Sequence, residues 1–95
     1  MAAPADNAWA ATYDDVLDQI TATLEQPDLP SGATGWTARA ALTSTPTVFT
    51  YDSSTDPTKT LTPDSPASGT YNVQIAWTVG GVAQEWSAAK QVVVS

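Results

Sequence analysis

Residues 70–79 read Thr-Tyr-Asn-Val-Gln-Ile-Ala-Trp-Thr-Val, and this stretch decides the fold class. Apolar and polar side chains alternate along it without a break, which is the period of a β-strand with one buried face. Five side chains share the predicted apolar face: Tyr71, Val73, Ile75, Trp77 and Val79. The stretch therefore predicts a long strand in a mainly β protein.

A tight turn follows this strand. Gly80-Gly81 can supply the positive φ angles that a two-residue hairpin needs. The predicted register has three facing pairs: Val79 with Val82, Trp77 with Gln84, and Ile75 with Trp86. In that register the two tryptophan strands share one buried face.

Shorter strand signals lie on both sides of the hairpin. The expected strands span residues 36–42, 48–51, 59–62 and 90–94. Pro63 and Pro66 bound the third, which we expect to be an edge strand. In the last, the run Val92–Val94 predicts either burial on both faces or an edge that pairs with something else.

The first 30 residues carry a different pattern. Over residues 8–25 the apolar side chains fall at helical spacing on one stripe: Trp9, Tyr13, Val16, Leu17, Ile20 and Leu24. Acidic residues occupy the opposite face, and Pro27 ends the expected helix. The stripe must be covered by the β body or by another chain. The 27–32 linker is long enough to let the helix leave the body, which favours another chain.

These patterns predict two parts in one short chain. Residues 1–30 form an acidic arm and an amphipathic helix with a Pro-rich linker, and residues 31–95 form a β-sandwich body. The six residues of the apolar stripe are the candidate partner-docking site. Because a chain of 95 residues buries a small core, contact with a partner is one way to supplement it.

Charge is unevenly distributed and argues against several partners. Residues 1–28 carry six acids and no base, out of a net charge of −7 for the chain. Three basic residues cannot build the positive stripe that nucleic acid requires, nor a patch for anionic membranes. No apolar run approaches the 18 residues of a membrane-spanning helix. Residues 1–6 lack the regions of a signal peptide, so we expect either use without Sec export or prior removal of a signal.

The residue types needed for catalysis are sparse. The chain has no histidine and no cysteine, so it offers no Ser-His-Asp triad, no disulfide and none of the commonest metal ligands. No Gly-rich phosphate loop is present, because Gly80-Gly81 belongs to a hairpin. We therefore expect a protein that is not an enzyme and that uses no metal or other cofactor.

Two pairs of carboxylates are candidate sites. Asp14 and Asp15 are neighbours on the expected helix and so do not face each other, which favours a solvated or partner-facing surface. Asp52 and Asp56 lack the dense alternation of oxygen ligands of a calcium loop, which favours a plain turn.

Four tryptophans could form a sugar-stacking platform: Trp9, Trp36, Trp77 and Trp86. The last three lie on apolar faces of expected strands, where packing in the core is the default. Trp9, at the edge of the expected helix, anchors that helix either to this domain or to a neighbour.

Residues 35–95 resemble the small immunoglobulin-like accessory domains of tailed-phage virions. The resemblance rests on the aromatic strand SGTYNVQIAW (68–77), the hairpin GGV (80–82) and the valine-rich end QVVV (91–94). It implies a small immunoglobulin-like antiparallel β-sandwich, here preceded by the N-terminal amphipathic helix, with a binding or decoration role and no catalysis. The chain departs from a full immunoglobulin domain in having room for five or six strands and no cysteine pair.

The function expected from these features is that of a structural virion protein of a tailed bacteriophage. Its most specific form is a capsid decoration or other head or tail accessory subunit, located in the virion and assembled on other virion structural proteins. The alternative is a secreted or cell-surface β-sandwich module that binds glycan or protein.

Overall fold

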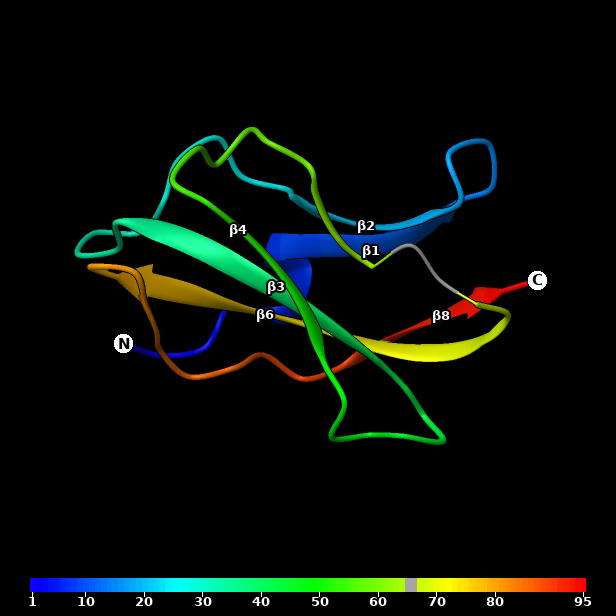
Figure 1. The fold of residues 1–95 in the computed structure, drawn as a ribbon. Helices are drawn as coiled ribbons and strands as arrows, with labels where there is room; N and C mark the ends of the chain where they lie inside the picture. The colour runs from blue at the N-terminus through cyan, green and yellow to red at the C-terminus, as the bar shows by residue number, and fades with distance from the viewer. Residues whose placement is uncertain (65–66) are drawn as a thin grey trace.

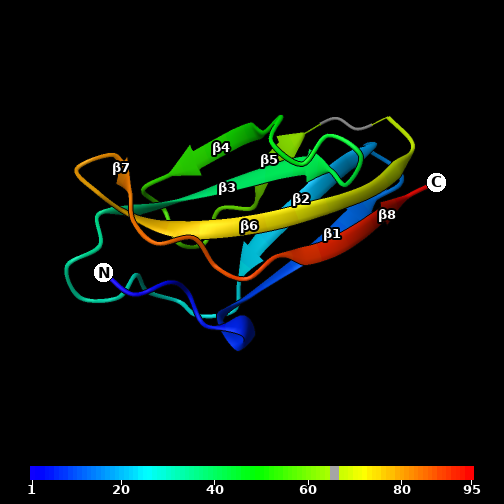
Figure 2. The ribbon, with the colours of Figure 1, turned by 90° about the horizontal axis from the view of Figure 1, so that it is seen from below.

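The computed structural model describes residues 1–64 and 67–95, which form two antiparallel β-sheets packed face to face (Figure 1). One sheet has three strands in the order β1 (Trp9–Asp14), β2 (Gln19–Leu24) and β5 (Leu61–Asp64). The other has five: β4 (Thr50–Ser54), β3 (Gly35–Leu42), β6 (Gly69–Val79) and β7 (Val82–Ala83) in that order, with β8 (Lys90–Val94) also paired to β6. A short 3-10 helix, η1 (Asp6–Ala8), precedes β1. In Figure 2, β3, β6 and β8 cross in front of β1 and β2.

The long alternating strand is central to the larger sheet, as its sequence predicts. β6 pairs with β3 along eight residues and with β7 and β8 on its other side. Tyr71, Val73, Ile75 and Trp77 point into the core, and Trp77 is 5% exposed. The mainly β class is therefore confirmed. Pro63 lies within β5 rather than at its boundary, and Pro66 lies outside the described residues.

The helix predicted over residues 8–25 is wrong. Residues 9–14 and 19–24 form the antiparallel hairpin β1–β2, in which Trp9 pairs with Leu24 and Tyr13 with Ile20. A spacing of four residues is close to one helical turn, but it is also two repeats of a strand. Ala11 and Ala22 also point inward. With these two residues included, the apolar side chains alternate along two strands joined by a turn.

The core lies between the sheets and draws on both. The largest fully buried side chains are Trp9, Trp36, Ile20, Leu61, Ile75 and Val73. Burying a large apolar side chain contributes about 1.5–3 kcal/mol. The N-terminal hairpin therefore supplies part of this chain's own core, and Trp9 anchors to this domain.

Two side chains join the sheets at opposite edges, where the strands of different sheets lie close. Asp52 on β4 accepts a hydrogen bond from the backbone N–H of Thr62 on β5, 2.9 Å from Oδ2. Lys90 on β8 donates from Nζ to the carbonyl oxygens of Asp6 and Trp9, at 2.7 and 2.6 Å. These two side chains act as polar clasps between the sheets.

The Gly80-Gly81 hairpin forms with the expected positive φ angles of 58° and 81°. Val79 pairs with Val82, and Gln84 donates its backbone N–H to Trp77, so two predicted pairs are confirmed. The third pair is wrong: Ser87, not Trp86, bonds to the backbone of Ile75, through its N–H at 2.8 Å and its Oγ at 3.0 Å. A slip of one residue reverses the face to which a side chain points. Trp86 therefore lies on the outer face of the sheet and not in the core, where the predicted register placed it.

The last strand alternates in the ordinary way. Val92 and Val94 are buried and Val93 is 69% exposed. Burial of this run on both faces is therefore wrong, and β8 instead pairs with β6 from Gly69 to Val73.

Candidate binding surfaces

The six residues predicted to dock a partner are divided by the structure. Trp9, Ile20 and Leu24 are buried in this chain's core, and Tyr13 packs against it. Val16 and Leu17 lie in the turn between β1 and β2, where they are 87% and 65% exposed. These two are the members of the stripe that remain accessible to a partner.

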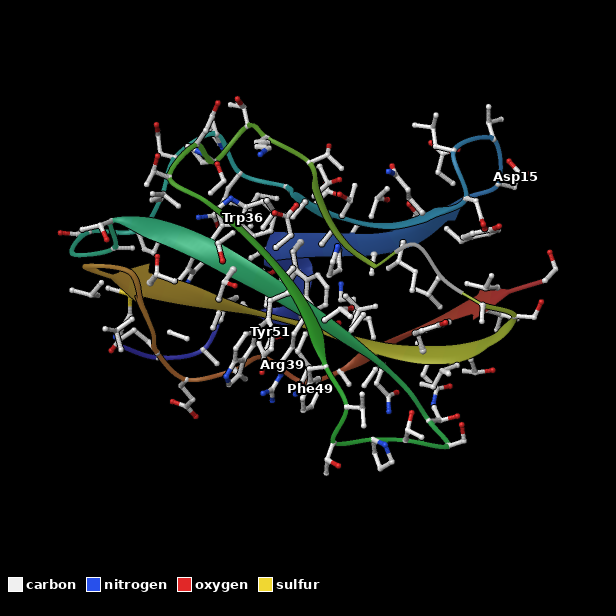
Figure 3. All side chains as sticks on the ribbon, in the orientation of Figure 1. Asp15, Trp36, Arg39, Phe49 and Tyr51 are labelled. Atoms are coloured by element: carbon white, nitrogen blue, oxygen red, sulfur yellow. The ribbon has the colours of Figure 1, made fainter. Side chains whose placement is uncertain are left out.

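The β1–β2 turn holds its two apolar residues in a defined conformation. The Asp14 carboxylate accepts hydrogen bonds from the backbone N–H groups of Val16 and Leu17, at 3.0 and 3.1 Å. Asp18 takes the left-handed conformation at φ 53°, which an aspartate tolerates better than most residues. The turn therefore presents Val16 and Leu17 outward on a fixed support. We call residues 14–18 the hairpin tip; Asp15 marks it in Figure 3.

A hydrogen bond from Tyr13 closes the hairpin tip. Its hydroxyl donates to the Asp18 carboxylate at 2.5 Å. This bond, followed by burial and by the charges of Asp18, Asp15 and Asp14, raises the pKa of Tyr13 from 10.0 to about 12. The tip thus combines two exposed apolar side chains with three carboxylates.

A second surface feature lies on the outer face of the five-stranded sheet, around Arg39 of β3. The guanidinium carbon is 4.0 Å from the ring centroid of Phe49 and 4.0 Å from that of Trp86. Tyr51 completes the group, with its ring centroid 6.1 Å from Phe49 and 6.2 Å from Trp86. Figure 3 shows Arg39, Phe49 and Tyr51 together, away from the hairpin tip. We call Arg39, Phe49, Tyr51 and Trp86 the Arg39 platform.

The pairing of three segments explains how this platform forms. Arg39 pairs with Tyr51 across β3 and β4, and with Gln74 across β3 and β6. Its Nε donates to the Gln74 side-chain oxygen at 2.9 Å, and the Gln74 amide donates to the carbonyl of Ser87 at 2.9 Å. The residue after Trp86 is thereby tied to the sheet.

An open hollow of about 440 Å³ lies farther along the same sheet. Its lining is mostly hydroxyl-bearing: Thr34, Ser53, Ser54, Thr55, Thr78 and Gly81. Ser53 pairs with Thr37 as Tyr51 pairs with Arg39, so Ser53 and Tyr51 share one face of β4. The platform and the hollow are therefore neighbours on the outer face.

The four tryptophans do not form one sugar platform. Trp9, Trp36 and Trp77 are at most 5% exposed, whereas Trp86 is partly exposed beside Arg39. Sequence reasoning missed Arg39, Phe49 and Tyr51. The available signal was the alternation of residues 36–42, which places Arg39 opposite the apolar face. Its partners lie just before β4, on β4 and after β7, and only strand pairing brings them to Arg39.

Among residues 1–64 and 67–95, no group of three acidic, histidine or cysteine side chains is placed to hold a metal ion. In the same part of the chain, no helix has the length and apolar character needed to cross a membrane. What the described surface offers are the hairpin tip and the Arg39 platform with its hollow.

Comparison with known proteins yields no match to a family model, a curated protein or a solved structure.

Proposed function

We propose that this chain is a non-enzymatic structural accessory protein of a tailed-phage virion, docked on other virion proteins through the hairpin tip. The observation that carries the docking role is the exposure of Val16 and Leu17, at 87% and 65%, on a turn that Asp14 holds in place. Two exposed apolar side chains gain free energy when a partner covers them.

The chemistry of the hairpin tip defines its partner. Asp14, Asp15 and Asp18 surround the two apolar side chains along the chain. The complementary surface is an apolar depression rimmed by lysine or arginine. Charge pairs at such a rim steer association and weaken as salt is added. Assembly should therefore be salt-sensitive.

We assign the two-sheet sandwich to the immunoglobulin-like class, with β1–β2 as an integral hairpin. The strand β6, the Gly80-Gly81 turn and the valine-rich β8 are the parts that carry the resemblance to phage accessory domains. Fold analogy of this kind supports a binding role.

Point variants test the docking role, since deleting residues 1–26 would also remove Trp9, Ile20 and Leu24 from the core. In phage particles grown from the genome that encodes this chain, we expect mass spectrometry to find the protein in fixed copy number. Val16→Asp and Leu17→Asp should each reduce its incorporation about tenfold or more, because a carboxylate is then buried at an apolar contact.

Val82→Asp is the matched control. Val82 is 64% exposed in the β6–β7 hairpin, so the same chemical change is made away from the tip. Its incorporation should equal that of the unaltered protein. Absence of the protein from purified particles would refute the virion assignment. Normal incorporation of both tip variants would refute docking through the tip.

A further inference from the structure

Arg39 has no carboxylate partner within the described residues, although the chain contains ten acids. The ion pair found there joins Lys90 to Asp6, at 3.9 Å. Of the five N–H donors of the Arg39 guanidinium, the one on Nε is bonded to Gln74. No side-chain nitrogen among these residues is both buried and unpaired, so the other Arg39 nitrogens are at least partly accessible to solvent.

The guanidinium is held in place before any ligand arrives. Phe49 and Trp86 each lie 4.0 Å from its carbon, and Gln74 fixes its Nε. Gln74 takes the Nε donor, which leaves the remaining N–H donors for recognition. An arginine edge matches a carboxylate with two parallel hydrogen bonds. Because its side chain is already ordered, binding costs little conformational entropy.

The surroundings of Arg39 suit a sugar ring. Tyr51 is 58% exposed and offers an aromatic surface next to the guanidinium. The apolar C–H face of a pyranose packs on such a ring. Ser53, two residues along β4, leads into the hydroxyl-lined hollow, whose donors and acceptors suit the hydroxyls of neighbouring sugar units.

We propose that the Arg39 platform binds a carboxylated sugar unit of a glycan. Arg39 receives the carboxylate, Tyr51 stacks on the ring, and the hollow takes the adjoining sugar. The distribution of charge allows an acidic ligand here, because six of the acids lie in residues 6–28, in the three-stranded sheet and its adjoining segments. Two acids adjoin the platform in sequence: Glu85, exposed next to Trp86, and Asp52, next to Tyr51, whose carboxylate accepts the hydrogen bond from the Thr62 N–H.

Binding can be measured by calorimetry and by tryptophan fluorescence, with Trp86 as the partly exposed reporter. The probes are sialyllactose and a glucuronate-containing hexasaccharide, each compared with a neutral counterpart: lactose and the carboxyl-reduced hexasaccharide. We expect at least one acidic probe to bind about tenfold or more tightly than its neutral counterpart. Failure of both acidic probes to bind, or equal binding of acidic and neutral forms, would overturn the proposal.

Three variants locate the site. Arg39→Gln and Tyr51→Ala should each weaken binding about tenfold or more. Lys59→Gln makes the same change of charge at an exposed residue outside the platform and should change affinity less than about twofold. Tyr51 is exposed, so its variant keeps the test decisive if Arg39→Gln does not fold. Unchanged affinity in Tyr51→Ala would overturn the assignment.

Two further measurements separate this proposal from its rivals. The first uses an acidic peptide such as oligoglutamate. If this peptide binds the platform and neither acidic saccharide does, the ligand is a protein and not a glycan, and the proposal is overturned. Val16→Asp should bind the saccharide as the unaltered protein does. Saccharide binding by the platform and docking through the hairpin tip are therefore tested by different variants, and failure of one does not imply failure of the other.

Discussion

The two sheets have similar inner faces and different outer faces. On the three-stranded sheet the outward positions of β1 and β2 are small or polar, and Thr12 and Thr21 share a hydrogen bond of 2.7 Å across the pair. On the five-stranded sheet the outward positions carry Phe49, Tyr51 and Arg39, joined by Trp86. Single apolar side chains on an outer face are normal, but a cluster of large aromatic groups is not. Core packing does not account for such a cluster, because these groups lie outside the core.

The inner faces of the sheets contribute to stability, whereas the outer surfaces differ in what they can bind. The inner faces of both sheets form one core and should respond alike to substitution. The hairpin tip exposes Val16 and Leu17, and the outer face of the five-stranded sheet exposes Tyr51, so a partner or ligand could cover apolar groups at both places. Substitutions can test whether the two sheets share one core. They can also test whether the sheet edges and the hairpin tip contribute less to the free energy of unfolding.

The largest effect is expected from Trp9→Ala and Trp77→Ala, one from each sheet. Both tryptophans are at most 5% exposed, and removal of such a side chain costs on the order of 3–5 kcal/mol. A small domain has about 5–10 kcal/mol of stability, so both variants should be close to unfolding at 37 °C. Urea denaturation measures the loss. If residues 9–24 alone melted in Trp9→Ala, with the other sheet intact, the hairpin would be a separate folding unit and the two sheets would not share one core.

An intermediate effect is expected at the edges, where Asp52 and Lys90 clasp the sheets together. Asp52→Ala leaves the Thr62 N–H without its partner, and Lys90→Met keeps the apolar stem while removing the ammonium. Each should lower the free energy of unfolding by about 1–3 kcal/mol. Lys59→Met is the matched control, because Lys59 is exposed and its side chain makes none of the hydrogen bonds found among the described residues. Loss of stability in the control equal to that in Lys90→Met would indicate an effect of net charge.

The smallest effect concerns the hairpin tip and is read by titration. The pKa of Tyr13 is raised to about 12 in the folded protein, mainly by its hydrogen bond to Asp18, against 10.0 for an ordinary tyrosine. The folded state holds the phenolic proton more tightly, so the stabilisation is complete below pH 10 and is lost as pH rises from 10 to about 12.

Absorbance at 295 nm checks this expectation when the titration of Tyr13→Phe is subtracted. Asp18→Asn should bring the pKa of Tyr13 back toward 10.0, because a neutral amide is a weaker acceptor and asparagine tolerates the left-handed backbone. A Tyr13 midpoint at 10.0 in the unaltered protein would show that the tip is not closed by this bond.

Local pattern alone determined the mainly β class and much of the larger sheet. The alternation of residues 70–79 and the pair Gly80-Gly81 specify a strand and a turn with little help from other residues, and both are found. Period-2 alternation and positive φ are local properties, which explains their success.

The N-terminal segment required tertiary information because its pattern fits two structures. Apolar residues four apart satisfy a helix and a strand alike, and Ala11 and Ala22 are too weakly apolar to separate the two. Docking of Trp9, Ile20 and Leu24 into the core selects the hairpin. That choice leaves Val16 and Leu17 in the turn, a position that no helical pattern predicts.

The Arg39 platform was decided by tertiary structure almost entirely. Sequence alternation places Arg39 on an outer face, but the neighbouring rings come from residues 49, 51 and 86, which strand pairing brings together. The position of Trp86 depends on a one-residue slip, produced when the Ser87 hydroxyl and N–H bond to Ile75. A single competing hydrogen-bond pattern thus moves a tryptophan from core to surface. Such competition between long-range contacts is invisible in local periodicity, which is why the strands could be read from the sequence and this surface could not.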